Sequence, residues 1–350
     1  RGLGDVYKRQ VGQVHAETYD ELFEATKALP WEKFIPKNGK FWVTKANSIK
    51  SKLFSPSDIQ SIMKKAIVER LKQVYHMEWF PEDGAQYPIR VSILKDEVTI
   101  GLDTSGVSLH KRGYRKLTAK APITETLAAA LIMLTPWKGD RILVDPFCGS
   151  GTFPIEAAMM AADIAPGLNR SFLAEQWTHL VPKKCWMDAA EDARYRIRND
   201  IETDIQGFDI DGDVIKSARE NAKLAGVEKR CHFEVADVAD FAAKQEAIVL
   251  TNPPYGERMS TIEGAAKLAR TLGRQMEAHP CAGVYAITAD MDFETHYGKR
   301  ANKRRKMYNG MIPCQLYMYY SAPKFEHTAK PMPKSGFDGK RTAPNRFNKK

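Results

Sequence analysis

The segment Asp145-Pro-Phe-Cys-Gly-Ser-Gly-Thr-Phe-Pro constrains the fold more than any other part of the chain. It follows the apolar strand pattern of residues 142–145 and leads into a helix pattern over residues 154–162. Glycines at such a strand-to-helix turn let the backbone approach a ligand closely, and the helix N-terminus supplies amide donors. The segment therefore predicts a ligand site at the end of a strand in an α/β domain.

Strand and helix patterns alternate from residue 141 onward, as a doubly wound parallel sheet requires. The predicted strands span residues 142–145, 206–209, 232–235, 247–250 and 284–287. Two further apolar stretches, 306–312 and 315–320, have no helix between them and predict an antiparallel hairpin. We expect an α/β fold, a Rossmann-like domain with a seven-stranded, mostly parallel sheet.

The preceding part of the chain predicts a small α+β unit. Its expected elements are a helix ending near Ala28, a helix over residues 57–75, and strands over 41–46, 89–94 and 98–102. Residues 1–10 contain no Met, and we expect them to be a fragment edge or non-native sequence outside the fold. The predicted division is an α+β module over 11–116, an α/β domain over 117–322 and a basic tail over 323–350.

The composition argues against several classes of protein. The apolar fraction is 43% and the charged fraction 27%, and no apolar run approaches the roughly 20 residues that span a bilayer. Five cysteines without a C-x-x-C pair and eight histidines without an H-E-x-x-H spacing give no support for a metal site or a disulfide framework. We expect a cytoplasmic monomer with no membrane segment and no metal.

The charge pattern favours a polyanionic partner, because the formal net charge is +10. The tail over 323–350 holds eight Lys or Arg against Glu326 and Asp338, and its Pro-rich composition predicts disorder. Residues 299–306 contain six basic residues in eight. Such a run is typical of a solvated loop, but its place before the predicted hairpin favours contact with a nucleic-acid backbone.

The glycine segment does not fit two familiar phosphate-binding patterns. It lacks the Gly-Lys-Ser/Thr of a Walker A loop, and Pro154 stands where G-x-G-x-x-G has its third glycine. S-adenosyl-L-methionine (AdoMet) fits better: Asp145 suits its ammonium group, Asp209 its ribose hydroxyls and Asp237 its adenine amino group, each near the end of a successive predicted strand. Cys148 is interpreted as a packing residue, because no motif places a base beside it.

The segment Thr251-Asn-Pro-Pro-Tyr follows the fourth predicted strand. Two consecutive prolines stiffen the chain and remove amide donors, which leaves the Asn252 amide and the Pro253 carbonyl as fixed acceptors. Two acceptors on the hydrogens of an exocyclic amine favour a pyramidal nitrogen with an available lone pair. Tyr255 would stack on a base that has left its helix or loop. The predicted catalytic residues are Asn252, Pro253, Pro254 and Tyr255.

With these motifs in order, the chain resembles THUMP-domain class I RNA methyltransferases of the group that makes N2-methylguanosine in large-subunit ribosomal RNA. The resemblance covers about residues 19–323 and rests on Leu109-His-Lys-Arg-Gly-Tyr-Arg, Ala121-Pro-Ile-Thr-Glu-Thr-Leu-Ala-Ala-Ala, the segment from Asp145, Ile164-Ala-Pro-Gly-Leu-Asn-Arg and Asn252-Pro-Pro-Tyr-Gly-Glu-Arg. The connection over 165–206, with Trp177 and Trp186, resembles an insertion of the same group. Such proteins normally begin with a further ferredoxin-like segment, so we expect the THUMP module to be N-terminally incomplete.

The resemblance implies AdoMet as cofactor, RNA as partner, and roles for individual residues. Pro122 and Thr124 would lie near the methionine end of AdoMet. The implied cofactor-binding residues are Pro122, Thr124, Asp145, Pro146, Phe147, Cys148, Gly149, Ser150, Gly151, Thr152, Asp209, Ile210, Asp237 and Val238. The expected RNA contacts are Lys111, Arg112, Tyr114, Arg115, Arg258, Lys303, Arg304 and Arg305.

Three alternatives stay open. The N-P-P-Y chemistry serves adenine N6 of DNA or RNA as well as guanine N2, and Glu257 is a candidate partner for the ring N–H of guanine. A sister THUMP family methylates guanine N2 in tRNA. The third alternative is a non-catalytic RNA-binding assembly factor, against which the intact Asn252-Pro-Pro-Tyr argues. In each RNA-binding case, deletion of residues 324–350 should weaken RNA binding and its salt dependence without changing AdoMet affinity.

Overall fold

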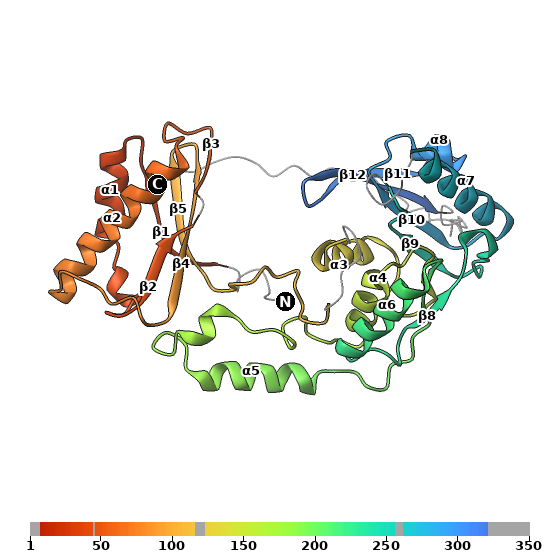
Figure 1. Ribbon diagram of the computed structural model, residues 1–350, viewed down its shortest axis with the longest axis horizontal. Coiled ribbons are helices and arrows are strands. Elements are labelled where there is room, and N and C mark those ends of the chain that lie inside the picture. The colour runs from red at the N-terminus through yellow and green to blue at the C-terminus, as the bar shows by residue number, and fades with distance from the viewer. Residues whose placement is uncertain (1–7, 45, 116–122, 256–261, 321–350) are drawn as a thin grey trace, which may run out of the picture. The chain divides into compact units, whose positions relative to one another are not determined.

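The computed structural model describes residues 8–44, 46–115, 123–255 and 262–320. An N-terminal module and a C-terminal domain each have their own sheet and their own buried core (Figure 1). The fold class predicted from the sequence, a doubly wound α/β domain preceded by an α+β module, is confirmed.

The N-terminal module is a five-stranded sheet covered by two long helices (Figure 1). The strands lie in the order β1-β5-β4-β2, and β3 pairs with β4. Thr18 and Glu21 form a capping box that starts the first helix. The elements are β1 (Lys8–His15), α1 (Tyr19–Ala28), the 3-10 turn η1 (Trp31–Lys33), β2 (Lys40–Val43), β3 (Asn47–Ile49), α2 (Pro56–Tyr75), β4 (Gln86–Leu94) and β5 (Glu97–Asp103).

Two strands of this module, β1 and β3, were not predicted. Excluding residues 8–10 from the fold was wrong, because Lys8 to Gln10 begin β1 and pair antiparallel with the end of β5. Both missed strands are short or polar, so backbone hydrogen bonds to a neighbouring strand hold them rather than an apolar pattern.

The C-terminal domain has a seven-stranded sheet in the order β11-β12-β10-β9-β6-β7-β8. Among the described strands, β12 runs antiparallel to both of its neighbours, and the other neighbouring pairs are parallel. The strands are β6 (Leu143–Asp145), β7 (Ile205–Asp209), β8 (His232–Val235), β9 (Ile248–Thr251), β10 (Gly283–Thr288), β11 (Lys303–Asn309) and β12 (Ile312–Tyr320). The helices are α3 (Glu125–Leu134), α4 (Thr152–Ala161), α5 (Lys183–Tyr195), α6 (Gly212–Leu224), α7 (Ile262–Ala278) and α8 (Phe293–Tyr297), with 3-10 turns η2 (Leu173–Gln176) and η3 (Val238–Asp240).

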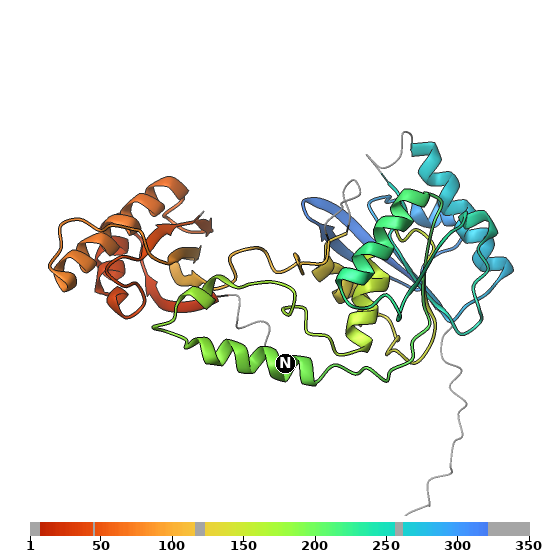
Figure 2. The ribbon, with the colours of Figure 1, turned by 60° about the horizontal axis from the view of Figure 1, so that its bottom comes forward.

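Alternate side chains of each strand fill the two faces of this sheet. Leu143 and Leu250 pack with α3, α4 and α6, whereas Val144 and Val249 pack with α7 and α8 (Figure 2). The central strands β6, β9 and β10 are buried on both sides, and the carboxyl ends of the parallel strands meet along one edge. In open α/β sheets this edge is where ligands bind.

The hairpin at the end of the domain differs from its prediction. Strand β11 begins at Lys303, so Lys303 to Lys306 lie in an edge strand and not in a loop before the hairpin. The reason is the pairing of β11 with β12, which runs from Lys303 opposite Met318 to Asn309 opposite Ile312. Backbone pairing tolerates charged side chains at an exposed edge.

Part of the connection over residues 165–206 packs against the N-terminal module. Ala174 and Trp177 belong to the buried core of that module. The Trp177 indole nitrogen donates to the carbonyl oxygen of Gln86 (2.9 Å), and its ring stacks on Tyr87 with 5.1 Å between centroids. In the described part of the chain, no helix is both long and apolar enough to cross a membrane.

Candidate active site

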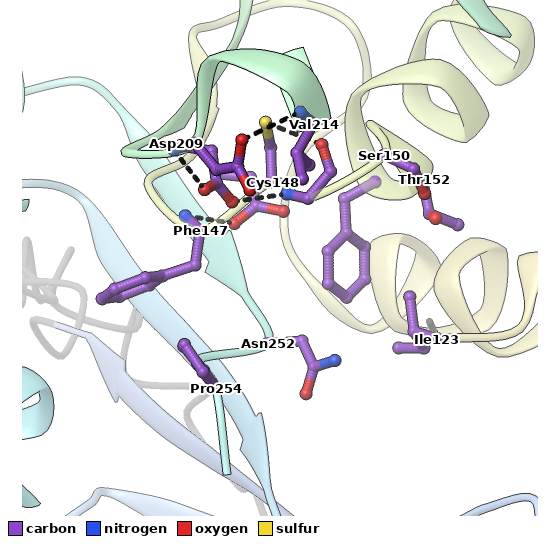
Figure 3. A pocket seen from close by; sticks show the side chains of 13 residues that line it. Ile123, Phe147, Cys148, Ser150, Thr152, Asp209, Val214, Asn252 and Pro254 are labelled. Carbon is purple, nitrogen blue, oxygen red and sulfur yellow. Dashed lines mark hydrogen bonds between the residues drawn. The ribbon is translucent and has the colours of Figure 1, made fainter. Parts of the chain in front are cut away.

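Three neighbouring strands bring the two sequence motifs to one edge of the sheet. Strand β6 ends at Asp145, β7 ends at Asp209 on one side of it, and β9 leads into Asn252 on the other. A cavity of about 290 Å³ lies at this edge (Figure 3). Its lining residues are Ile123, Asp145, Phe147, Cys148, Gly149, Ser150, Thr152, Phe153, Asp209, Asp211, Val214, Asn252 and Pro254.

The glycine segment forms the upper wall of the cavity in Figure 3. Gly149 and Gly151 have φ angles of +53° and +83°, a region that favours glycine. An added Cβ at Gly151 would come within 2.9 Å of the Phe233 ring, whereas one at Gly149 would meet nothing within 4 Å. Gly151 is therefore needed for packing, and Gly149 leaves open space for a ligand.

Ser150 has a buried hydroxyl with no hydrogen-bond partner among the described residues. A buried polar group without a partner costs free energy, and Ser150 lines the cavity at the start of α4. Together with the open space at Gly149, this hydroxyl fits a polar ligand at the helix N-terminus.

Asp145 joins the glycine segment to the N-P-P-Y turn. Its side chain is buried, and its Oδ1 accepts hydrogen bonds from the Phe147 amide (3.1 Å) and the Thr251 hydroxyl (2.6 Å). Thr251 is the last residue of β9, directly before Asn252. Sequence reasoning missed this role of Thr251, although its place beside Asn252 was a signal.

Asp209 holds the glycine segment from the other side. Its Oδ2 accepts from the Gly149 amide (3.0 Å) and its Oδ1 from the Asp211 amide (3.1 Å). Asp211 caps α6 by accepting from the amides of Asp213 and Val214, and it lines the cavity. Asp211 was not predicted, but an Asp directly before a helix pattern could have identified it.

The N-P-P-Y turn contributes Asn252 and Pro254 to the cavity. Asn252 is 5% exposed, and Figure 3 shows its side chain across the cavity from the glycine segment. Tyr255 does not line the cavity: its ring is buried in the core, and its hydroxyl contacts Cys314 Sγ (3.7 Å) and accepts from Asn309 Nδ2 (3.5 Å). Stacking of Tyr255 on a base stays a prediction.

Other residues expected at the cofactor do not line this cavity. Asp237 starts η3, and its carboxylate accepts from the Ala239 amide (2.9 Å). It follows β8, which is separated from β6 by β7. The expected residues outside the lining are Thr124, Pro146, Gly151, Ile210, Asp237 and Val238, together with Pro253 of the catalytic set. Pro122, Glu257 and Arg258 lie outside the described residues.

The sequence missed three apolar residues of the cavity, Ile123, Phe153 and Val214. Cys148 is buried, and burial raises the pKa of its thiol well above the usual value. A thiol with a raised pKa is a weak nucleophile, which agrees with its interpretation as a packing residue.

The structure gives no support to the predicted contact of Arg112, Tyr114 and Arg115 with RNA, because internal partners hold all three side chains. Tyr114 is 1% exposed and donates to Glu156 Oε1 (3.1 Å), and Arg112 pairs with Glu156 Oε2 (3.5 Å). Arg115 donates to the Thr152 hydroxyl (2.6 Å), and its Nε lies 3.4 Å from Glu125 Oε1. The carboxylates of α3 and α4 hold these groups inside the protein, whereas Lys111 is exposed.

Comparison with known families matches both parts of the chain. Residues 112–318 match the model "RMKL-like, methyltransferase domain", and residues 16–103 match the THUMP domain. The chain is 44% identical over 320 residues to a Bacillus subtilis (strain 168) protein described as "Putative RNA methyltransferase YpsC", a match that covers 91% of this chain and 83% of the relative. It is 35% identical to the ribosomal RNA large subunit methyltransferase K/L of Syntrophotalea carbinolica, covering 87% of this chain and 45% of that protein.

Solved structures agree with this assignment. A Listeria monocytogenes protein described as "a predicted N6-adenine-specific DNA methylase" has a TM-score of 0.84 and 46% identity, covering 90% of this chain and 82% of that one. A structure described as "a putative methyltransferase complexed with SAH" has a TM-score of 0.82 and 40% identity, covering 90% and 84%. SAH is the product that AdoMet leaves after methyl transfer, which agrees with AdoMet as the cofactor of this family. The chain thus belongs to the RMKL-like family of AdoMet-dependent methyltransferases and carries a THUMP domain before its catalytic domain.

Proposed function

We propose that this protein methylates the exocyclic N2 of a guanine in large-subunit (23S) ribosomal RNA, giving N2-methylguanosine. One observation carries the proposal: Asn252 and Pro254 line the same cavity as the glycine segment. The THUMP domain and the names of the relatives, an RNA methyltransferase and large-subunit ribosomal RNA methyltransferases, support RNA as the substrate. The chain spans under half of the length of the K/L relative, so the activity of that whole protein is a proposal for this chain.

The cofactor would lie between the strand ends. Asp145 suits its ammonium group, Asp209 its ribose hydroxyls, and the unpartnered Ser150 hydroxyl a further polar group. Gly149 gives the room that a close ligand needs. AdoMet, when bound, supplies an electrophilic methyl group on a sulfonium sulfur.

The N-P-P-Y turn would orient the acceptor amine. The Asn252 side-chain oxygen and the Pro253 carbonyl would accept its two hydrogens, which turns the nitrogen lone pair toward the cofactor. Asn252 is nearly buried, so these hydrogen bonds form where water competes little. The Thr251–Asp145 hydrogen bond would keep the turn and the cofactor loop in a fixed relation. No strong base is required, because the methylated nitrogen is acidic and loses its proton to solvent.

Adenine N6 of DNA or RNA is the second candidate target. The Listeria structure described as an N6-adenine-specific DNA methylase is 46% identical to this chain, and the same two acceptors serve either amine. The two functions differ in product and not in the mechanism proposed for the turn.

The test is transfer of tritiated methyl groups from AdoMet to total RNA from cells that lack this protein, followed by nucleoside analysis. We expect label in N2-methylguanosine of the large-subunit RNA. Label in N6-methyladenosine would show that the target base is adenine and not guanine, and label in tRNA would show that the substrate is tRNA and not ribosomal RNA.

The Asn252→Ala variant tests the role of the N-P-P-Y turn. Its kcat should fall at least about 100-fold while its AdoMet affinity stays within a few-fold of the wild type. Failure of the wild-type chain to bind AdoMet or label RNA would favour a binding or assembly role.

A further inference from the structure

The hairpin formed by β11 and β12 points its turn toward the catalytic edge of the sheet. Because β12 is antiparallel to both β10 and β11, β11 runs in the same direction as β10 and β9. Its end at Asn309 therefore lies at the edge where β9 leads into Asn252. Both views of the domain show the hairpin turn projecting from the sheet (Figures 1 and 2).

The pairing register shows how far the turn projects. Strand β12 pairs with β10 only from Gln315, opposite Thr288, so Ile312 to Cys314 pair with β11 alone. At about 3.4 Å per residue, these three residues carry the turn roughly 10 Å past the end of β10. Thr251 pairs with Ala286, so the turn stands above the level of the N-P-P-Y segment.

The turn exposes large apolar side chains at its end. Met311 is 94% exposed, Tyr308 69% and Ile312 42%. Single exposed apolar residues are common, but here Tyr308 and Ile312 lie on opposite faces of the hairpin end and Met311 lies in the turn between the strands, so the tip is apolar on both faces. Such clusters mark a contact with another molecule.

The flank of the hairpin is basic. Lys303, Arg304, Arg305 and Lys306 are all exposed on the edge strand β11. Arg304 pairs with Glu294 of α8 (3.4 Å). Lys303 and Arg305 alternate with Arg304 and so lie on the other face of the strand, the face of Asn309. A basic strand beside an apolar tip suits a nucleic acid, whose phosphates and base stacks need these two kinds of side chain.

The root of the turn contacts the catalytic segment. Asn309 is 8% exposed and donates to the Tyr255 hydroxyl (3.5 Å), and Cys314 Sγ lies 3.7 Å from the same oxygen. One contact comes from β11 and the other from β12, so both strands of the hairpin hold its tip in place relative to the N-P-P-Y turn. A target base cannot reach the cavity from within a stack, so the reaction needs an element that separates the base from its neighbours.

We propose that Tyr308, Met311 and Ile312 form a wedge that inserts into the RNA beside the target nucleotide and keeps its neighbours unstacked while the base occupies the cavity. The basic strand β11 contacts the adjoining phosphates. This inference rests on the proposed function, because it assumes a folded RNA whose base must leave its stack.

The experiment compares folded and unfolded RNA as substrates of the full chain. Met311→Ser and Tyr308→Ser change exposed side chains outside the cofactor cavity, so folding and AdoMet affinity should stay as in the wild type. Met187→Ser is the matched control, because Met187 is 70% exposed on α5, a helix without buried residues. The substrate is large-subunit RNA from cells that lack the protein, used either folded with magnesium or heat-denatured without it.

We expect Met311→Ser to lower kcat/KM at least tenfold on folded RNA and less than twofold on denatured RNA, with no change for Met187→Ser. An equal loss on both RNAs, or no loss on folded RNA, would overturn the wedge. Nucleoside analysis tests the proposed function separately from the wedge. If the label lies in a base other than guanine, the proposed function fails, but the ratio of kcat/KM on folded RNA to kcat/KM on denatured RNA still tests the wedge. If the wild type labels no RNA, filter binding to folded RNA decides: affinity at least threefold weaker for Met311→Ser supports the wedge, and equal affinity overturns it in favour of a protein partner.

Discussion

Two basic segments of this chain have similar sequences, but the arginines of one are largely buried and the basic residues of the other are exposed. Residues 109–115 and residues 299–306 are both rich in Lys and Arg, and both were expected to contact RNA. The Arg112 and Arg115 side chains are only 11% exposed, whereas Lys303 to Lys306 are all exposed on a strand edge. Basic composition therefore does not by itself identify an RNA-binding surface.

The difference comes from two carboxylates far away in the sequence. Glu125 and Glu156 stand in the apolar helices α3 and α4 and are 3% and 2% exposed. A buried carboxylate needs a partner, and Arg112 and Arg115, which precede α3 in the chain, supply it. A lone acid inside an apolar helix pattern is thus a signal that some basic residues of the chain are buried.

The largest effect is expected for Glu156→Ala. Loss of this carboxylate leaves the Arg112 guanidinium and the Tyr114 hydroxyl without their acceptor in a buried site, so the free energy of unfolding should fall by about 3–5 kcal/mol in urea denaturation. Arg304→Ala is the control, because the exposed Arg304–Glu294 pair should be worth ~0–1 kcal/mol. An equal loss in the free energy of unfolding for the two variants would contradict the proposed difference between the buried and the exposed segment.

Arg115→Met should affect both stability and the cofactor. Arg115 donates to Thr152, a cavity residue, and pairs with Glu125, so we expect a loss of about 2–3 kcal/mol in the free energy of unfolding. AdoMet should bind roughly tenfold more weakly in calorimetry, since an energy of ~1.4 kcal/mol at the site gives that factor. Lys111→Met, at an exposed position, should change neither quantity. An unchanged AdoMet Kd in Arg115→Met would confine this arginine to a structural role.

The double variant Lys303→Ala, Arg305→Ala should change RNA binding and leave the fold intact. Each lost phosphate contact lowers the slope of log affinity against log salt by about 1, so the slope should fall by about 2. The free energy of unfolding should stay within ~0.5 kcal/mol of the wild type, because both side chains are exposed. An unchanged salt slope would place the RNA elsewhere on the protein.

The smallest effect is a pH dependence of stability from Glu156. Burial raises the pKa of Glu156 above its usual value of 4.5. Between those two values the folded protein binds more protons than the unfolded chain, so the free energy of unfolding falls as the pH rises from about 4.5 through the raised pKa. Urea denaturation at a series of pH values should show a slope of up to ~1 kcal/mol per pH unit that Glu156→Gln removes. A slope that persists in the variant would assign it to another group.

The order of strand patterns along the chain was enough to predict the parallel sheet and the meeting of the two motifs. Strand patterns and their order place Asp145, Asp209 and Asn252 at carboxyl ends of neighbouring strands, because parallel strands share one edge. Nine of the predicted site residues line the cavity for this reason. The spacing of apolar residues is a local property of the sequence, so strands and their order can be predicted from it.

The burial of polar groups and the identity of their partners could be known from the folded chain but not from the sequence pattern. Arg112 meets Glu156 across 44 residues, and Thr251 meets Asp145 across 106. The tertiary structure also fixed the register of β11 with β12, which turned an expected loop into an edge strand and set Asn309 against Tyr255. Desolvation and pairing depend on neighbours in space, so residues of the same charge were buried in one segment and left in water in the other.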